Sequence, residues 1–322
     1  MSANAAPQAS VPAPASASTT FAVVITCYNY RDFVAEAVDS ALAQTRAPKQ
    51  VVVVDDGSKD GSQDLLRERY GNDPRVTLLL CENGGQLVAF QRGLAVVDAD
   101  VVCFLDADDR WEPAHLETIG AIYDSRRDVD FVFNDIVLFG NESRTIAYAD
   151  RAADLGYTAI ATYEFVHWYG APTSAISLRR AMAERCLDLP PKTAQIWRLS
   201  ADNCLVYGTS ILLGRKYYLP TGTVGYRIHG KNGWWSNRGP LETYLNRLRS
   251  RGLVAEYARM AGMTPECIEL AKYEFKTKPD PSWDEIKRYA RLSLRRGGGP
   301  LKRWERALSI LSHRFRKKKR RA

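Results

Sequence analysis

Long apolar runs are missing from this chain of 322 residues. Because no stretch of about 18 residues is both apolar and uncharged, we expect no transmembrane helix. Residues 1–19 are rich in Ala, Pro and Ser and have neither a basic start nor an apolar core. We therefore expect this segment to be disordered, and to serve neither as a signal peptide nor as a membrane anchor.

Close pairs of cysteines are also missing. The six cysteines lie at positions 27, 81, 103, 186, 204 and 267, several of them inside apolar segments. This spacing does not fit a zinc site. We expect reduced, buried thiols in a cytoplasmic protein.

Glycine-rich phosphate-binding loops are absent as well. The first apolar segment, residues 21–26, is followed by CYNY and not by the G-x-G-x-x-G of dinucleotide-binding proteins. No G-x-x-x-x-G-K-[ST] motif occurs either. We expect any bound phosphate to be held by a metal ion instead of a glycine-rich loop.

The chain does contain apolar segments that alternate with amphipathic ones. Continuous apolar runs predict buried strands at residues 21–26, 51–54, 76–80 and 101–105. Between them, the apolar periodicity predicts helices at about residues 32–44, 63–70 and 86–97. Strands that are apolar throughout and alternate with helices predict a parallel sheet covered on both faces.

The second half of the chain is less regular. We expect strands at residues 131–134, 136–139 and 174–178, and a helix at about residues 202–213. Residues 141–171 are irregular, with a short helix that contains Glu164, Phe165, His167 and Trp168. From residue 240 the pattern is helical, and the last helix is expected at about residues 301–313.

Three carboxylates follow the fourth predicted strand, at Asp106, Asp108 and Asp109. Ligands of open α/β sheets bind at the carboxyl ends of the strands, where these side chains are expected. Clustered carboxylates repel one another unless a cation neutralises them, and oxygen ligands suit Mg²⁺ or Mn²⁺. The cluster predicts a metal site, with an acidic solvated turn as the alternative.

Five segments in this order resemble the family 2 glycosyltransferases, which are inverting enzymes of the GT-A fold. The segments are VITCYN at 24–29, VVDDGS at 53–58, ENGG at 82–85, FLDADD at 104–109 and YRIHGKN at 226–232. The resemblance implies the α/β fold of nucleotide-diphospho-sugar transferases, with a mostly parallel central sheet flanked by helices and a helical C-terminal extension.

The resemblance also divides the chain. We expect a GT-A catalytic domain at residues 20–239, with a nucleotide-sugar half at 20–110 and an acceptor half at 111–239. Residues 240–322 then form a helical C-terminal region that ends in a basic amphipathic tail.

The resemblance places a donor site at the ends of the first two strands. Thr26 and Tyr28 correspond to contacts with the nucleoside, with the Tyr28 ring stacked on the base. Asp56, with Asp55 beside it, corresponds to the carboxylate that accepts a hydrogen bond from the pyrimidine N3–H. The alternative is a strand-end turn in which Asp56 caps the next helix. Arg92 corresponds to a polar contact with the donor, or is a solvated helix residue.

A metal site follows from the same resemblance. Asp108 corresponds to the direct metal ligand, Asp106 to a contact with the ribose or with metal-bound water, and Asp109 to a further ligand. His229 corresponds to a residue that completes the metal shell, and Arg227 beside it to a contact with the diphosphate. Imidazole suits Mn²⁺ better than Mg²⁺. A purely structural histidine is the alternative.

Inversion requires a base that deprotonates the acceptor hydroxyl. Asp202 matches the family's catalytic base at the start of a helix, although Ala201 stands where relatives have Glu. A positioned carboxylate suits this role. The alternative is that Asp202 only caps the helix that follows it.

The C-terminal tail is basic and amphipathic. One face of the last helix carries the apolar residues Leu301, Trp304, Leu308, Leu311 and Phe315. Seven basic residues at 314–321 account for most of the net charge of +8. Residues 301–321 therefore predict either an interfacial helix on an anionic membrane surface or a helix that packs on the catalytic domain. No nucleic acid is expected as a partner, because no binding module accompanies the charge.

The sequence as a whole predicts a metal-dependent inverting glycosyltransferase that uses a nucleotide-diphospho-sugar, with a UDP-sugar favoured. The expected acceptor is a hydroxyl of a glycan or lipid-linked glycan, as in cell-surface polysaccharide synthesis, at the inner face of the cell membrane. Two alternatives stay open. One is a sugar nucleotidyltransferase, and the other is a non-catalytic GT-A domain that binds a membrane or a partner.

Overall fold

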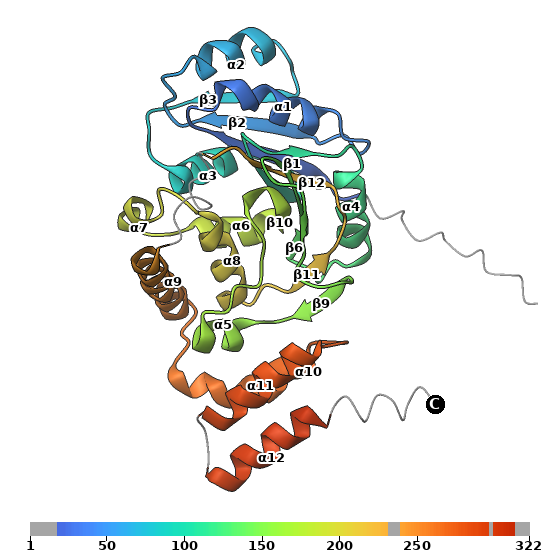
Figure 1. Ribbon diagram of the computed structural model, residues 1–322, viewed down its shortest axis with the longest axis vertical. Helices are drawn as coiled ribbons and strands as arrows, with labels where there is room; N and C mark the ends of the chain where they lie inside the picture. Colours follow the sequence, from blue (N-terminus) through green and yellow to red (C-terminus); the bar gives the residue numbers. More distant parts are fainter. Residues whose placement is uncertain (1–17, 231–238, 296–298, 313–322) are drawn as a thin grey trace, which may run out of the picture.

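An eight-stranded sheet with the strand order β3-β2-β1-β4-β10-β6-β11-β9 forms the centre of the molecule (Figure 1). The computed structural model describes residues 18–230, 239–295 and 299–312. The strands of this sheet are β1 (Phe21–Cys27), β2 (Gln50–Asp55), β3 (Val76–Leu80), β4 (Val101–Asp106), β6 (Phe131–Asn134), β9 (Ala153–Gly156), β10 (Ile176–Arg179) and β11 (Lys216–Leu219). The predicted 1–19 segment lies mostly outside the described residues.

The first half of the sheet is parallel, as predicted. β1 pairs in parallel with both β2 and β4, and β2 pairs in parallel with β3. The crossovers are α1 (Arg31–Leu42), α2 (Ser62–Tyr70) and α3 (Gln86–Ala95). In Figure 1, α1 and α2 lie on one side of these strands and α3 on the other, which explains why the strands are apolar on both faces. Parallel strands end at one edge, so the polar residues after β1, β2 and β4 meet there.

The second half of the fold is mixed. β10 lies antiparallel between β4 and β6, and β11 is parallel to β6. A second sheet that the sequence did not predict has the order β5-β12-β7-β8. Its strands are β5 (Arg110–Trp111), β7 (Ile136–Gly140), β8 (Thr145–Ile146) and β12 (Val224–Ile228). Two of these strands have only two residues each, which is too short for a periodic pattern.

The predicted helix around residues 164–168 is partly wrong. Helix α5 (Ala159–Phe165) ends before His167 and Trp168. The reason is local, because Val166 adopts a left-handed conformation with φ of 51°, which stops an α-helix. The segment counted as irregular also contains β8 and β9.

Helices cover the rest of the molecule. They are α4 (His115–Ser125), α6 (Arg180–Leu187), α7 (Pro191–Ile196), α8 (Asp202–Ile211), α9 (Pro240–Met260), α10 (Ala271–Lys276), α11 (Trp283–Arg295) and α12 (Pro300–Leu311). Short 3-10 turns occur at Thr173–Ala175 and Pro265–Leu270. None of the helices in the described ranges is long and apolar enough to cross a membrane.

The C-terminal helices pack below α5 and β9 in Figure 1. Buried polar contacts join them to the central part. The Glu274 carboxylate of α10 accepts hydrogen bonds from the backbone N–H groups of Ile160, at 2.9 Å, and Ala161, at 3.3 Å. It also accepts one from the Tyr289 hydroxyl of α11, at 2.5 Å. A carboxylate at the first turn of α5 is favourable because the helix dipole attracts negative charge there.

Candidate active site

An acidic turn follows β4, beside the end of β1. The register places Thr26 opposite Asp106, and the Ala107 N–H donates to the Thr26 carbonyl at 3.1 Å. The Asp109 N–H donates to the Asp106 carbonyl at 3.1 Å, which closes the turn. Asp108 and Asp109 are buried, at 8% and 1% exposure. The structure thus brings together the three carboxylates and Thr26, as predicted.

Burial and mutual repulsion raise the pKa of two carboxyls of this cluster, Asp106 and Asp109. Burial, followed by the charges of Asp108 and Asp202, raises the pKa of Asp106 to about 8. Burial, followed by the charges of Asp108 and Asp106, raises the pKa of Asp109 well above its usual range. A bound cation would relieve this repulsion, so the chemistry of this donor set fits a divalent metal ion.

Asp109 differs from the other two carboxylates in its partners. Its Oδ2 accepts a hydrogen bond from the Ser174 hydroxyl at 2.5 Å, and its Oδ1 accepts one from the Arg227 N–H at 2.8 Å. Both oxygens are therefore engaged by the protein. The geometry indicates that Asp109 holds β12 against the acidic turn, whereas the prediction of metal ligation by Asp109 stays a prediction.

Asp108 lies next to His229, as the metal-site prediction requires. The His229 Nε2 is 3.0 Å from Asp108 Oδ2, and the imidazole stacks on Phe33 with ring centroids 5.1 Å apart. Within the described ranges, no three His, Cys, Asp or Glu side chains converge closely enough to hold a metal ion by themselves. Mg²⁺ commonly takes one or two carboxylates and completes its shell with substrate phosphates and water, so this arrangement still fits such an ion.

The Arg227 side chain is turned toward the protein. Its Nε donates to the Asp108 carbonyl at 2.8 Å, and its guanidinium forms an ion pair with Glu36. The guanidinium also lies over the rings of Phe33, at 4.8 Å, and Phe139, at 4.4 Å. Arg227 thus holds the acidic turn in place. The contact of Arg227 with a diphosphate stays a prediction. It would need a guanidinium N–H group that does not bind Asp108 or Glu36.

The carboxylates after β2 have different roles. Asp55 Oδ1 accepts hydrogen bonds from the N–H groups of Gly57, at 3.1 Å, and Ser58, at 2.9 Å. Its Oδ2 is buried and has no hydrogen-bond partner among the described residues. Asp55 therefore stabilises the turn that contains Gly57 and Ser58 through Oδ1, and Oδ2 accepts no hydrogen bond from the described residues.

Asp56 does not cap the following helix, α2, whose N-cap is Gly61. Its Oδ1 accepts from the Gly84 N–H and its Oδ2 from the Gly85 N–H, both at 2.7 Å. Each carboxylate oxygen has a second lone pair, so Asp56 can accept a further hydrogen bond. Arg92 is 3.5 Å from Asp56 Oδ1 and donates mainly to the Glu82 carbonyl at 2.7 Å.

Tyr28 and Asp202 complete the set of predicted residues. The Tyr28 side chain is 47% exposed, which leaves an aromatic surface for a ligand. Asp202 is the first residue of α8, whose N-cap is Ala201. Its Oδ1 accepts from the Asn203 N–H at 2.9 Å and does not reach further into the helix, so the capping alternative is not observed. Burial raises the pKa of Asp202 to about 6.

Sequence reasoning missed two residues that hold this site together. Gln86, at the start of α3, donates from Nε2 to Asp106 Oδ1 at 3.0 Å and accepts at Oε1 from the Ala201 N–H at 2.9 Å. Ser174 binds both Asp109 and the Asp106 N–H, the latter at 3.1 Å. Gln86 directly follows Gly84-Gly85, and this position next to a family motif is a signal that could identify it. The sequence contains no comparable signal for Ser174.

Comparisons with known proteins identify sequences similar to this chain. Residues 22–187 match glycosyl transferase family 2. The chain is 34% identical over 216 residues to the uncharacterized glycosyltransferase alr2836 of Nostoc sp., covering 65% of each chain. It is 36% identical over 96 residues to the putative teichuronic acid biosynthesis glycosyltransferase TuaG of Bacillus subtilis, covering 30% of this chain and 38% of TuaG. It is 30% identical over 118 residues to chondroitin synthase of Pasteurella multocida, covering 34% of this chain and 12% of that protein.

Solved structures with a similar fold include S. aureus TarS 1-349. The complex of TarS with UDP-GlcNAc has a TM-score of 0.52 at 17% identity and covers 91% of this chain and 81% of that one. The complex with UDP has a TM-score of 0.53 at 19% identity, with 92% and 89% covered. At this identity the likeness concerns the fold, which confirms the predicted GT-A architecture. The chain covers 65%, 38% and 12% of the lengths of the three sequence relatives above, in the order given.

Proposed function

Because this chain belongs to glycosyl transferase family 2, we propose that it transfers a sugar, with inversion, from a nucleotide-diphospho-sugar to a hydroxyl group of a glycan or lipid-linked acceptor. One observation carries the proposal. The Gln86 side chain binds both Asp106 Oδ1, at 3.0 Å, and the N–H of Ala201, at 2.9 Å, which places Asp202 at the start of α8 beside the acidic turn. A base thus stands beside an acidic cluster suited to a metal and a diphosphate, which is the pairing that inverting transfer requires.

The donor is proposed to be a UDP-sugar. The exposed ring of Tyr28 offers a stacking surface, and Asp56 has unused acceptor capacity for a pyrimidine N–H. Thr26, Asp55 and Arg92 border the same edge of the sheet. UDP and UDP-GlcNAc are bound in the TarS structures of similar fold, which supports a uridine nucleotide.

The metal is proposed to be Mn²⁺ or Mg²⁺. Asp108 and His229 would hold it, with Asp106 beside them. When bound, such an ion neutralises the diphosphate and stabilises the charge that develops on the leaving nucleotide. Asp109 and Arg227 act on this site by holding the turn and β12 together, through the Arg227 N–H and the Asp108 carbonyl.

Asp202 is proposed to accept the proton of the acceptor hydroxyl. Burial removes water from this carboxylate and raises its pKa to about 6. Asp202 is therefore still ionised at neutral pH and is a stronger base than an exposed aspartate. The oxygen of the acceptor then attacks the anomeric carbon from the face opposite to the diphosphate, and the bond to the diphosphate breaks.

A screen of nucleotide-sugars tests the proposed function. In the presence of Mn²⁺, UDP or a UDP-sugar is expected to raise the melting temperature, because a ligand at 100 times its dissociation constant stabilises the folded state by about 2.7 kcal/mol. Adenosine and guanosine nucleotides at the same concentration provide the comparison. If no nucleotide shifts the melting temperature with either Mn²⁺ or Mg²⁺, the transferase proposal is wrong.

We also propose that α12 places the protein on an anionic membrane surface, where lipid-linked acceptors are found. α12 packs on α11 through the buried Ala307 and Ile310. Three residues of the predicted apolar stripe, Leu301, Trp304 and Leu308, are exposed by 87%, 59% and 58%, whereas Leu311 packs partly buried against the core and Phe315 lies outside the described residues. An exposed apolar face with basic neighbours favours an interfacial helix. The basic residues at 314–321, which would add charge, lie outside the described residues.

Vesicle binding tests this docking surface. The double variant Trp304→Glu, Leu308→Glu is expected to weaken binding to phosphatidylglycerol vesicles about 30-fold, because two apolar side chains no longer enter the interface. The matched control is Tyr244→Glu, Leu248→Glu on α9, whose side chains are similarly exposed, at 62% and 56%. Equal binding by the two variants, or equal binding of the unmodified protein to neutral vesicles, would contradict the proposal.

A further inference from the structure

Two segments far apart in the chain are joined at the candidate active site. The first is the turn Asn83-Gly84-Gly85-Gln86, and the second is the segment 198–201 that leads into α8. The Gln86 N–H donates to the Arg198 carbonyl at 2.8 Å, and the Ala201 N–H donates to Gln86 Oε1 at 2.9 Å. The Arg198 guanidinium donates to the Gly84 carbonyl at 3.2 Å and also to the Asn83 side chain. The segments thus share four hydrogen bonds.

The close approach of these segments depends on Gly85. Gly85 has φ of +90°, and a Cβ added there would lie 2.8 Å from the Arg198 Cα. A side chain at this position would push the 198–201 segment away. The turn is therefore built to let that segment lie directly on it.

The Gln86 side chain connects the two halves of the site. Its Nε2 donates to Asp106 Oδ1 at 3.0 Å and lies 3.4 Å from Thr173 Oγ1, while its Oε1 accepts from the Ala201 N–H. A side-chain amide has one donor end and one acceptor end, so the carboxylate and the N–H fix its orientation. Since Asp202 directly follows Ala201, one side chain links the position of Asp106 to that of Asp202.

The same turn also contacts the predicted nucleoside end. The N–H groups of Gly84 and Gly85 are those that bind Asp56. A displacement of the turn by a ligand at Asp56 would therefore move Gln86 and the start of α8 with it. The contacts run without interruption from Asp56, through the turn, to Asp202.

From these contacts we infer that Gln86 is a positioning residue that sets the place of the Asp202 base relative to Asp106, and that the turn 83–86 couples occupancy of the donor site to this placement. The inference rests on the proposed function, because it assigns Asp202 the role of base. Gln86 itself acts through Asp106 and Ala201 and does not take part in bond making.

Gln86→Met tests the inference by removing both hydrogen bonds while keeping a side chain of similar length. We expect the turnover number for transfer to fall about 100-fold, because a small misplacement of a catalytic group costs this much. The dissociation constant for UDP should change by less than about threefold, and the binding stoichiometry should stay the same. A merely destabilised protein would instead lose stoichiometry.

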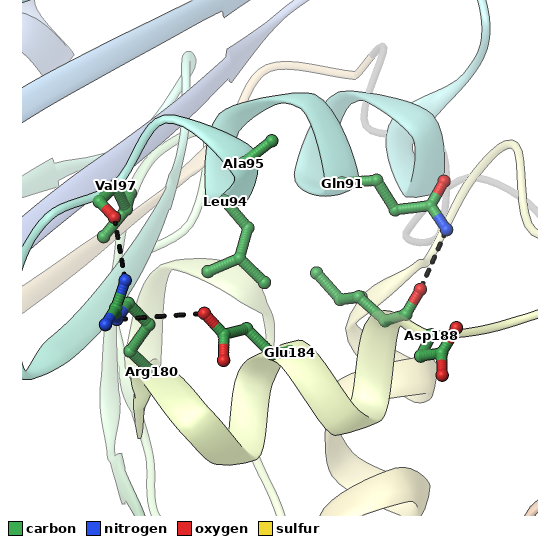
Figure 2. A pocket seen from close by; sticks show the side chains of 8 residues that line it. Gln91, Leu94, Ala95, Val97, Arg180, Glu184 and Asp188 are labelled. Carbon is green, nitrogen blue, oxygen red and sulfur yellow. Dashed lines mark hydrogen bonds and ion pairs between the residues drawn. The ribbon is translucent and has the colours of Figure 1, made fainter.

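Gln91→Met is the matched control. Gln91 lies on the same helix, and Figure 2 shows it lining a pocket with Glu184 and Asp188. Its Nε2 donates to the Leu187 carbonyl of α6 at 2.9 Å and not to a residue of the acidic turn. We expect this variant to retain the turnover number of the unmodified protein. If Gln86→Met turns over as fast as Gln91→Met, or loses UDP affinity in proportion to its turnover, the inference is overturned.

Hydrogen exchange gives a readout that does not need activity. In Gln86→Met, the Ala201 amide is expected to exchange about tenfold faster, because its acceptor is lost, whereas amides of β2 should be unchanged. Unchanged exchange at Ala201 would overturn the inference even in an active protein. If the unmodified protein binds no nucleotide, the proposed function is wrong. The exchange experiment needs no nucleotide, so it would still test whether Gln86 holds Ala201 in place.

Discussion

Replacing Asp202 by Asn is expected to slow sugar transfer about a thousandfold while donor binding is retained. Asn has nearly the same shape and can keep the hydrogen bond from the Asn203 N–H, but its amide cannot accept the proton of the acceptor hydroxyl. Steady-state rates of transfer, together with calorimetric titration of UDP, measure the two quantities separately. The matched control is Asp188→Asn, the same chemical change at an exposed residue after α6.

The pH dependence of transfer gives an independent check on Asp202. Burial raises the pKa of this carboxyl to about 6, so below that pH the group is protonated and cannot act as a base. The rate of the unmodified protein should therefore fall about tenfold per pH unit below about pH 6 and level off above it. Asp202→Asn should lack this acidic limb. If Asp202→Asn keeps more than about a tenth of the rate, another group supplies the base.

Replacing Asp108 by Ala is expected to abolish the metal dependence of the protein and to lower transfer by a factor on the order of a thousand. The variant removes the carboxylate that lies 3.0 Å from His229, and with it the oxygen ligand best placed for a divalent ion. UDP affinity measured with Mn²⁺ should then equal the affinity measured with EDTA. In the unmodified protein, EDTA should weaken UDP binding and stop transfer.

Asp98→Ala is the control for this variant. Asp98 precedes β4 and lies near the opposite end of the strand from Asp108, and its exposed side chain pairs with Lys49. Its loss removes a carboxylate without affecting the candidate metal site, so metal dependence should remain. A UDP affinity that still depends on Mn²⁺ in Asp108→Ala would show that Asp108 is not the main ligand.

These two variants also separate the proposed enzyme from the alternatives that the sequence left open. A non-catalytic domain would release no UDP from a UDP-sugar, whereas the proposed enzyme would release UDP in the unmodified protein and much less of it in Asp202→Asn and Asp108→Ala. A sugar nucleotidyltransferase would release pyrophosphate from a nucleoside triphosphate and a sugar phosphate, whereas the proposed reaction releases UDP. Product analysis of the unmodified protein distinguishes these reactions.

Some features of the site could be predicted because they depend on local pattern. Apolar runs define β1, β2 and β4, and parallel pairing brings their carboxyl ends to one edge. The positions of Thr26, Asp56 and Asp106 follow from this rule alone. Helix α8 was also predicted, so Asp202 was expected at the start of a helix.

Other features could not be predicted because they depend on contacts across the chain. The alternative that Asp56 caps a helix, which the sequence allowed, is not observed, since the Gly84 and Gly85 N–H groups take up its oxygens. Similarly, the carboxylate of Asp109 is engaged by Ser174 and by the Arg227 N–H, which is 118 positions away. No periodic pattern encodes such polar partners.

The sequence by itself therefore determined the family, through the resemblance of five segments, and it determined the parallel half of the sheet and the edge at which the carboxylates gather, because hydrophobic period acts locally. Only the tertiary structure decided which carboxylates are engaged by the protein, which face of α12 stays exposed, and how Gln86 joins Asp106 to the start of α8. The physical reason is that a hydrogen bond between residues 115 positions apart, such as that from Ala201 to Gln86, depends on how the two halves of the fold pack together.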